Sequence, residues 1–269
     1  MRKKTWLELT ITDDYMFKLV MNHKNICKHL IEKILGIKIR EIKYIENEKS
    51  FKNAYDAKGI RLDVYVEDKQ NSRFILEMQV RDYGEKELAK RSRYYQSSID
   101  YDFLLAGHNY KELQNAAVIF FCPFKLFDGK RRMYTFVNTC KENKNIILKD
   151  GVLKVMLSSA GEKTDDIDKD VAAFLDYMNG VMGKNRFISE VDDTIRAMKK
   201  DSVREADYMT IQMIMDEERE ESFLEGRADG VLSSLKNLIK NTDWSVERAM
   251  DVLQIHGDDR KKYAGLVNG

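Results

Sequence analysis

The chain has 269 residues but no apolar run that approaches the length needed to cross a bilayer. Its three cysteines are widely spaced and include no Cys-x-x-Cys pair, which argues against a disulfide framework and a zinc knuckle. The N-terminus lacks the apolar stretch and the small-residue cleavage site of a secretory signal. Together these absences predict a soluble protein of a reducing compartment, located in the cytoplasm and without a membrane partner.

The sequence also lacks the motifs of several enzyme classes. The four histidines are scattered and none belongs to a His-Glu-x-x-His motif, so a zinc enzyme is not expected. No P-loop or dinucleotide fingerprint occurs, and we expect no organic cofactor. The net charge is only +1, which argues against nonspecific binding of nucleic acids over the whole surface. It does not exclude local patches of positive charge.

Apolar periodicity predicts helices and strands in the first part of the chain and helices alone after about Ser158. This order predicts an α/β (α+β) core with a central mixed sheet and an all-helical C-terminal extension. A polar, glycine-punctuated stretch around Glu225–Gly230 predicts a hinge. The expected parts are a core at 1–158, a helical extension packed on that core at 159–225, and a short helical tail at 226–269. The expected helices cover 13–35, 85–106, 166–178, 186–200 and 201–225, and the expected strands cover 37–44, 60–66, 74–80, 117–122, 132–137 and 152–157.

Two neighbouring strand patterns carry acidic residues. Residues 60–66 and 74–80 are separated by a short polar turn and look like an antiparallel hairpin. Side chains alternate along a strand, so Glu77 and Gln79 share a face, and Asp63 joins them if it lies opposite. A carboxylate on an apolar strand is costly unless it is paired or bound to a cation, and Mg²⁺ prefers such oxygen ligands. The alternative is a structural ion pair of these carboxylates with nearby cations, namely Arg61, Lys58 or Arg73.

The helix that follows is basic and aromatic. Lys86, Lys90 and Arg93 recur at spacings of three and four, and Tyr94 or Tyr95 could stack on a base or a sugar. Proteins bind DNA phosphates with this mixture of side chains. The alternative is a solvated charged face with its tyrosines half in the core.

Four segments in this order resemble one known family. They are Arg61-Leu-Asp63, Glu77-x-Gln79, the helical segment 90–96 and the strand segment 119–124. The chain resembles the PD-(D/E)XK nuclease family transposases, also described as recombination-promoting nucleases. The segment Asp14-Tyr-Met-Phe-Lys18 fits the same pattern. The resemblance is close over 10–136 and loose over 225–230.

The resemblance implies a restriction-endonuclease-like central mixed sheet flanked by helices. It also implies hydrolysis of DNA phosphodiester bonds with Mg²⁺, Mn²⁺ or another divalent cation, in a recombination-related role. Asp63 and Glu77 match the family's metal-binding acids, and Asp14 matches a helix-borne acid that some members place near the metal. The implied DNA-binding residues lie on the basic helix and are Lys90, Arg91, Arg93, Tyr94 and Gln96.

Gln79 stands where the superfamily more often has lysine. Glutamine can hold an attacking water by hydrogen bonding, but it carries no positive charge. Three alternatives follow: the metal acts unaided, Lys90 or Arg91 supplies the charge, or the site is dead. On the strength of the resemblance, we expect a metal-dependent endonuclease with Asp63, Glu77 and Gln79 as catalytic residues. The alternative is a catalytically inactive nuclease-fold module that binds DNA or a partner protein.

The helical C-terminal part has less specific expectations. Residues 231–266 fit a pair of short docking or assembly helices first and a DNA reader second. The helices beyond Ser158 could also make the chain a homodimer.

Overall fold

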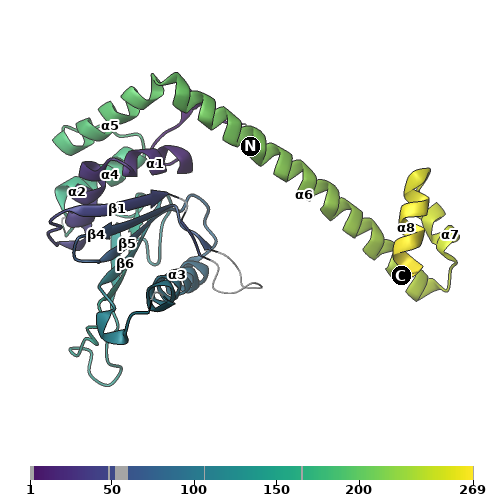
Figure 1. The fold of residues 1–269 in the computed structure, drawn as a ribbon, viewed down its shortest axis with the longest axis horizontal. Coiled ribbons are helices and arrows are strands. Elements are labelled where there is room, and N and C mark those ends of the chain that lie inside the picture. The colour runs from purple at the N-terminus through teal and green to yellow at the C-terminus, as the bar shows by residue number, and fades with distance from the viewer. Residues whose placement is uncertain (1–2, 48, 52–59, 106, 165, 269) are drawn as a thin grey trace. The chain divides into compact units, whose positions relative to one another are not determined.

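The computed structural model describes residues 3–47, 49–51, 60–105, 107–164 and 166–268. The chain separates into two compact units, Met1–Ser202 and Val203–Gly269. Among the described residues, no helix is long and apolar enough to cross a membrane. The first unit contains a mixed sheet with helices, and the second unit is helical (Figure 1).

The first unit contains both helices and strands, as the sequence predicts. Its helices are η1 (Trp6–Glu8), α1 (Asp14–Met21), α2 (Lys24–Leu35), α3 (Glu85–Leu105), η2 (Tyr110–Glu112), α4 (Lys169–Met178) and α5 (Arg186–Lys199). Its strands are β1 (Ile42–Asn47), β2 (Ser50–Phe51), β3 (Ile60–Arg61), β4 (Val64–Asp68), β5 (Arg73–Met78), β6 (Ala116–Cys122), β7 (Met133–Phe136) and β8 (Val152–Ser158).

Six strands form one mixed sheet in the order β1-β4-β5-β6-β8-β7, and β2 pairs separately with β3. The β4–β5 pair is antiparallel, whereas β6 lies parallel to both β5 and β8. Every residue of β6 is buried, which explains its continuous apolar sequence, because a central parallel strand is covered on both faces. The predicted central mixed sheet flanked by helices is therefore confirmed.

The two faces of the sheet bury different helices. Figure 1 shows α1, α2, α4 and α5 over one face and α3 over the other. The side chains of successive β6 residues point alternately toward the two faces of the sheet. Phe120 stacks with Tyr95 of α3 at a centroid distance of 6.1 Å. Phe121 lies 5.4 Å from Phe17 of α1 and 5.5 Å from Phe174 of α4. This alternation fixes α1 and α3 on opposite sides of the same central strands.

The first predicted helix is divided in two. α1 ends at Met21, where the N–H of Asn22 bonds back to α1 carbonyls, and α2 starts after His23, whose backbone is extended. Asparagine and histidine are weak helix formers, and they act here as caps instead of continuing one helix. α2 then ends where predicted, because Gly36 adopts the left-handed conformation with φ 65°.

The predicted hinge near Glu225–Gly230 is wrong. α6 (Ser202–Thr242) runs through Gly226 and Gly230 without a break. An interior glycine costs only about 1 kcal/mol relative to alanine, and the surrounding glutamate, arginine and leucine residues are good helix formers. Glycine ends a helix when it turns left-handed, and neither glycine has a positive φ.

A methionine-rich stripe of α6 lies on the surface and not in a core. Met209 and Met213 are 64% and 60% exposed on α6. The core of the second unit lies instead near the C-terminal part of α6, where α7 (Val246–Val252) and α8 (Asp258–Asn268) fold back. Its buried residues are Leu235, Ala249, Met250, Ile255 and Tyr263.

Truncating the ring between the sheet and α1 tests this packing. We expect Phe121→Ala to lower the free energy of unfolding by about 3–5 kcal/mol, because it removes a fully buried ring and leaves a cavity. Phe223→Ala is the matched control, because that ring is 67% exposed and its loss should change stability by less than about 0.5 kcal/mol. Urea unfolding measures both, and equal midpoints for the two variants would contradict the assigned core.

Candidate functional site

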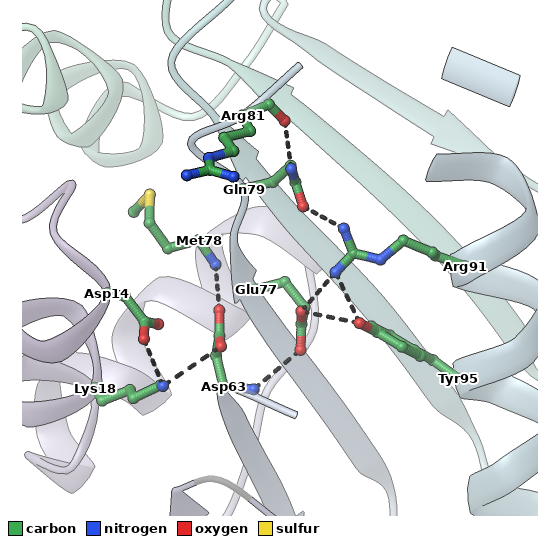
Figure 2. A network of polar contacts seen from close by, with 9 residues as sticks. All are labelled: Asp14, Lys18, Asp63, Glu77, Met78, Gln79, Arg81, Arg91 and Tyr95. Carbon is green, nitrogen blue, oxygen red and sulfur yellow. Dashed lines mark hydrogen bonds and ion pairs between the residues drawn. The ribbon is translucent and has the colours of Figure 1, made fainter. Parts of the chain in front are cut away.

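Asp63 and Glu77 meet where the β4–β5 ladder ends. Val64 pairs with Leu76, and continuing this register places Asp63 opposite Glu77. Side chains bond to backbone there: the N–H of Asp63 donates to Glu77 Oε1 at 3.0 Å, and the N–H of Met78 donates to Asp63 Oδ2 at 2.9 Å. Figure 2 shows the two carboxyl groups side by side. The hairpin thus holds two acids together by reciprocal hydrogen bonds.

One side of this acidic pair faces α3. Arg91 Nη2 lies 3.3 Å from Glu77 Oε2 and donates to the Tyr95 hydroxyl at 2.7 Å. The Tyr95 hydroxyl in turn donates to Glu77 Oε2 at 3.4 Å. Gln79 holds the same guanidinium: its Oε1 accepts from Arg91, and its Nε2 donates to the carbonyl of Arg81 (Figure 2). The Gln79 amide is therefore held at one end by the Arg81 carbonyl and holds Arg91 with the other.

The other side of the pair faces α1. Lys18 Nζ lies 3.6 Å from Asp63 Oδ1 and 2.7 Å from Asp14 Oδ2. Lys18 is only 6% exposed although its side chain is charged. Asp14 is one helical turn earlier, a spacing that places both side chains on one face of α1. Lys18 was not predicted as a site residue, and its signal was its position four residues after Asp14 in the family-like segment.

The pKa values of the two acids are raised. Burial, together with the negative charge of Asp14, raises the pKa of Asp63 to about 7, against the opposing effect of Lys18. Burial and the charge of Asp63 raise the pKa of Glu77 to about 8. Both effects disfavour ionisation, and a cation between the acids would reverse them. The site is therefore short of positive charge even with Lys18 and Arg91 in place.

The donor atoms suit a hard divalent cation. In the described part of the chain, no group of three or more His, Cys, Asp or Glu side chains has metal-site geometry. Mg²⁺ usually takes only one or two protein carboxylates and completes its shell with water and phosphate oxygens. Asp63 and Glu77 supply two adjacent carboxylates, one partly exposed and one buried. These residues fit a cation that shares its coordination with a bound phosphate.

Of the three cations that the sequence suggested as ion-pair partners, only Arg73 has a described side chain. Arg73, at the start of β5, lies over the Phe103 ring at 4.3 Å. Lys58 lies outside the described residues, as does the side chain of Arg61. The cations that the structure places at Asp63 and Glu77 are Lys18 and Arg91.

The residues predicted for DNA binding have different environments on α3. Lys90 and Arg93 are exposed, and Tyr94 is half-buried. Arg91 is turned toward Glu77. Gln96 is buried and donates to both carboxylate oxygens of Asp100 at 3.1 Å, so its side chain is directed into the fold. Of the residues predicted to bind DNA, Lys90 and Arg93 are therefore the two with exposed charged side chains.

One comparison with known proteins identifies a family. The sequence model of the PD-(D/E)XK nuclease family transposases matches residues 11–157, which is more than half of the chain. The matched region contains α1, β4, β5 and α3, and thus every side chain of the site described above. No curated protein and no solved structure gives a significant match.

The raised pKa values predict how stability depends on pH in EDTA. Below the ordinary carboxyl pKa near 4, Glu77 is protonated in both the folded and the unfolded chain. Between that pH and about 8 the folded protein keeps the proton that the unfolded chain has released, so raising the pH favours unfolding. We expect Glu77→Gln to remove this contribution and to gain on the wild type by at least about 1 kcal/mol between pH 5 and pH 8.5. Urea unfolding across this range measures it, and parallel curves would show that Glu77 titrates normally.

Proposed function

Since the chain belongs to the PD-(D/E)XK nuclease family transposases and has their restriction-endonuclease-like fold, we propose that it is a divalent-metal-dependent DNA endonuclease. The reaction is hydrolysis of a phosphodiester bond, in a recombination-related role. The observation that supports this most strongly is the pairing of Asp63 with Glu77, which places two carboxylates with raised pKa values at the end of β5.

Asp63 and Glu77 are the proposed ligands of Mg²⁺ or Mn²⁺, and Asp14 adds negative charge nearby. A divalent cation held there supplies charge neutralisation at the phosphate and lowers the pKa of a bound water. The reciprocal hydrogen bonds keep both carboxylates in place before the cation binds. Binding is thus preorganised by the hairpin itself.

The positive charge that Gln79 lacks comes from Lys18 and Arg91 in this proposal. Lys18 is buried beside Asp63, where its ammonium group stabilises negative charge that develops on the phosphate. Gln79 and Tyr95 orient Arg91 toward Glu77. Gln79 is therefore a positioning residue for a neighbouring cation, which keeps the site active without a lysine at position 79.

A catalytically inactive module is the second candidate. It is favoured by one observation, the full engagement of the Gln79 amide by Arg81 and Arg91, which leaves that side chain no role at an attacking water. Such a module would retain DNA or partner binding through the exposed Lys90 and Arg93. Metal affinity separates the two candidates, because an inactive module has no need of the carboxylate pair.

Neutralising either acid tests the active candidate. We expect the purified protein to nick DNA with Mg²⁺ and to stop with EDTA, and Asp63→Asn and Glu77→Gln to reduce nicking below detection. Asp102→Asn, which removes an exposed carboxylate of α3, should leave the rate unchanged. Gel assays of supercoiled DNA measure nicking, and isothermal titration with Mg²⁺ measures binding. No Mg²⁺ affinity together with retained DNA binding would support the inactive module instead.

Lys18 has its own test. We expect Lys18→Met to slow cleavage by about 10²–10³-fold, because a buried charge near the phosphate is lost, and Lys18→Arg to recover part of the rate. Because Lys18 lowers the pKa of Asp63, the Lys18→Met pH–rate profile should also move to higher pH. Lys111→Met removes an exposed lysine and serves as the control. If Lys18 only supports the fold, Lys18→Met will lower the stability of the protein and leave the pH–rate profile unchanged.

A further inference from the structure

A polar cavity lies among the helices of the first unit. It has a volume of ≈ 640 Å³ and is lined from α2, from the start of α4, and from the start of α5 with the segment before it. These helices cover the face of the sheet opposite α3. The side chains that determine its chemistry are His29, three cations and two acids, namely Lys169, Lys184, Arg186, Asp170 and Glu190. None of them belongs to the site around Asp63 and Glu77.

Asp170 fixes the inner wall of this cavity. It is 9% exposed, and both of its carboxylate oxygens are engaged: Oδ2 lies 2.8 Å from His29 Nε2, and Oδ1 accepts from Asn185 Nδ2 at 2.9 Å. The ring of Phe187 stacks on the His29 imidazole at a centroid distance of 4.4 Å. The negative charge of Asp170 is therefore satisfied inside the wall, and the imidazole is held in one orientation.

The rim of the cavity carries positive charge without matching ion pairs. Lys169, Lys184 and Arg186 are exposed there. Among the residues that the structure describes, none forms an ion pair with these three side chains, whereas the nearby Lys33 pairs with Asp168 at 3.2 Å. Three cations around one concave surface repel each other and raise the local concentration of anions. The three exposed cations outnumber the one exposed acid of the lining, Glu190, so the rim carries a net positive charge.

The N-terminal ends of α4 and α5 add to the positive electrostatic potential of the cavity. The first residues of α4 and α5 line the cavity, and the N-terminal end of a helix carries a partial positive charge. Arginine also offers a fork of N–H donors that matches phosphate oxygens, beside the point charges of the lysines. The combination of fixed imidazole, fork and ammonium groups matches a tetrahedral oxyanion better than a carboxylate.

We propose that this cavity binds a phosphate group, presented by a ligand of up to nucleotide size or by the backbone of bound DNA. Its volume falls within the range of small-molecule sites, which leaves room for more than a lone ion. The inference does not depend on metal-assisted cleavage, because no residue is shared between the two sites.

Pyrophosphate is the probe, titrated calorimetrically into the full-length protein in EDTA. We expect saturable binding that weakens about tenfold or more in the double variant Lys169→Gln/Lys184→Gln, because charge-assisted contacts to the phosphate are lost. The double variant Lys141→Gln/Lys144→Gln removes the same charge from an exposed loop and should bind as the wild type does. Asp63→Asn should bind pyrophosphate normally, which separates this inference from the proposed nuclease site.

The source of the phosphate is tested with DNA and with 5′-deoxyadenylate. If the DNA backbone crosses the cavity, Lys169→Gln/Lys184→Gln weakens duplex binding and reduces the slope of log K against log[salt] by about 2. If a free nucleotide is the ligand, the variant loses affinity for 5′-deoxyadenylate and binds duplex DNA normally. Absence of pyrophosphate binding in the wild type, or an equal loss in both double variants, would overturn the proposal.

Discussion

The pairing of Asp63 with Glu77 is the constraint on which the candidate site depends. Beyond the last pair of the β4–β5 ladder, each acid accepts a hydrogen bond from a backbone N–H group of the neighbouring segment. This exchange satisfies two backbone donors and also fixes two carboxylates next to each other. A sheet that continued regularly would satisfy the same donors with carbonyl oxygens and would have no reason to hold two acids.

The cost of this arrangement explains the rest of the site. Burial raises both pKa values, the charge of Asp14 raises that of Asp63 further, and the charge of Asp63 raises that of Glu77, so only nearby positive charge makes the ionised forms acceptable. Lys18 comes from a helix on one face of the sheet and Arg91 from a helix on the other (Figures 1 and 2). Both reach the acids because the pair lies at the end of the strands, where the sheet no longer separates the two helical layers. The remaining deficit of positive charge is what a divalent cation would fill.

Local sequence patterns predicted much of the fold and part of the candidate site. Alternation along the strand placed Glu77 and Gln79 on one face, and the register seen in the structure then placed Asp63 opposite Glu77. The continuous apolar run of β6 was enough to identify a strand covered on both faces. Lys18 was missed because its role arises from the packing of α1 on the sheet, a contact between residues 45 positions apart that no local period encodes. Gln96 was assigned to the DNA surface from its neighbours in sequence, whereas the helical period turns it inward toward Asp100.

Position 79 shows how one substitution is accommodated. A lysine there would have placed its charge on the face that Arg91 now occupies, and the glutamine instead holds that arginine by its amide. The positive charge near Glu77 thus comes from Arg91 of α3. In α6 the sequence pattern was misleading. Two glycines in a charged stretch suggested a hinge, but the helix is continuous there.

The most direct test of the central claim is the anomalous diffraction of crystals grown with Mn²⁺. The account predicts one strong peak in contact with carboxylate oxygens of both Asp63 and Glu77, at coordination distances of roughly 2.0–2.3 Å. A map in which Mn²⁺ is absent from this position at saturating concentration, with Lys18 remaining the nearest cation to Asp63, would contradict it.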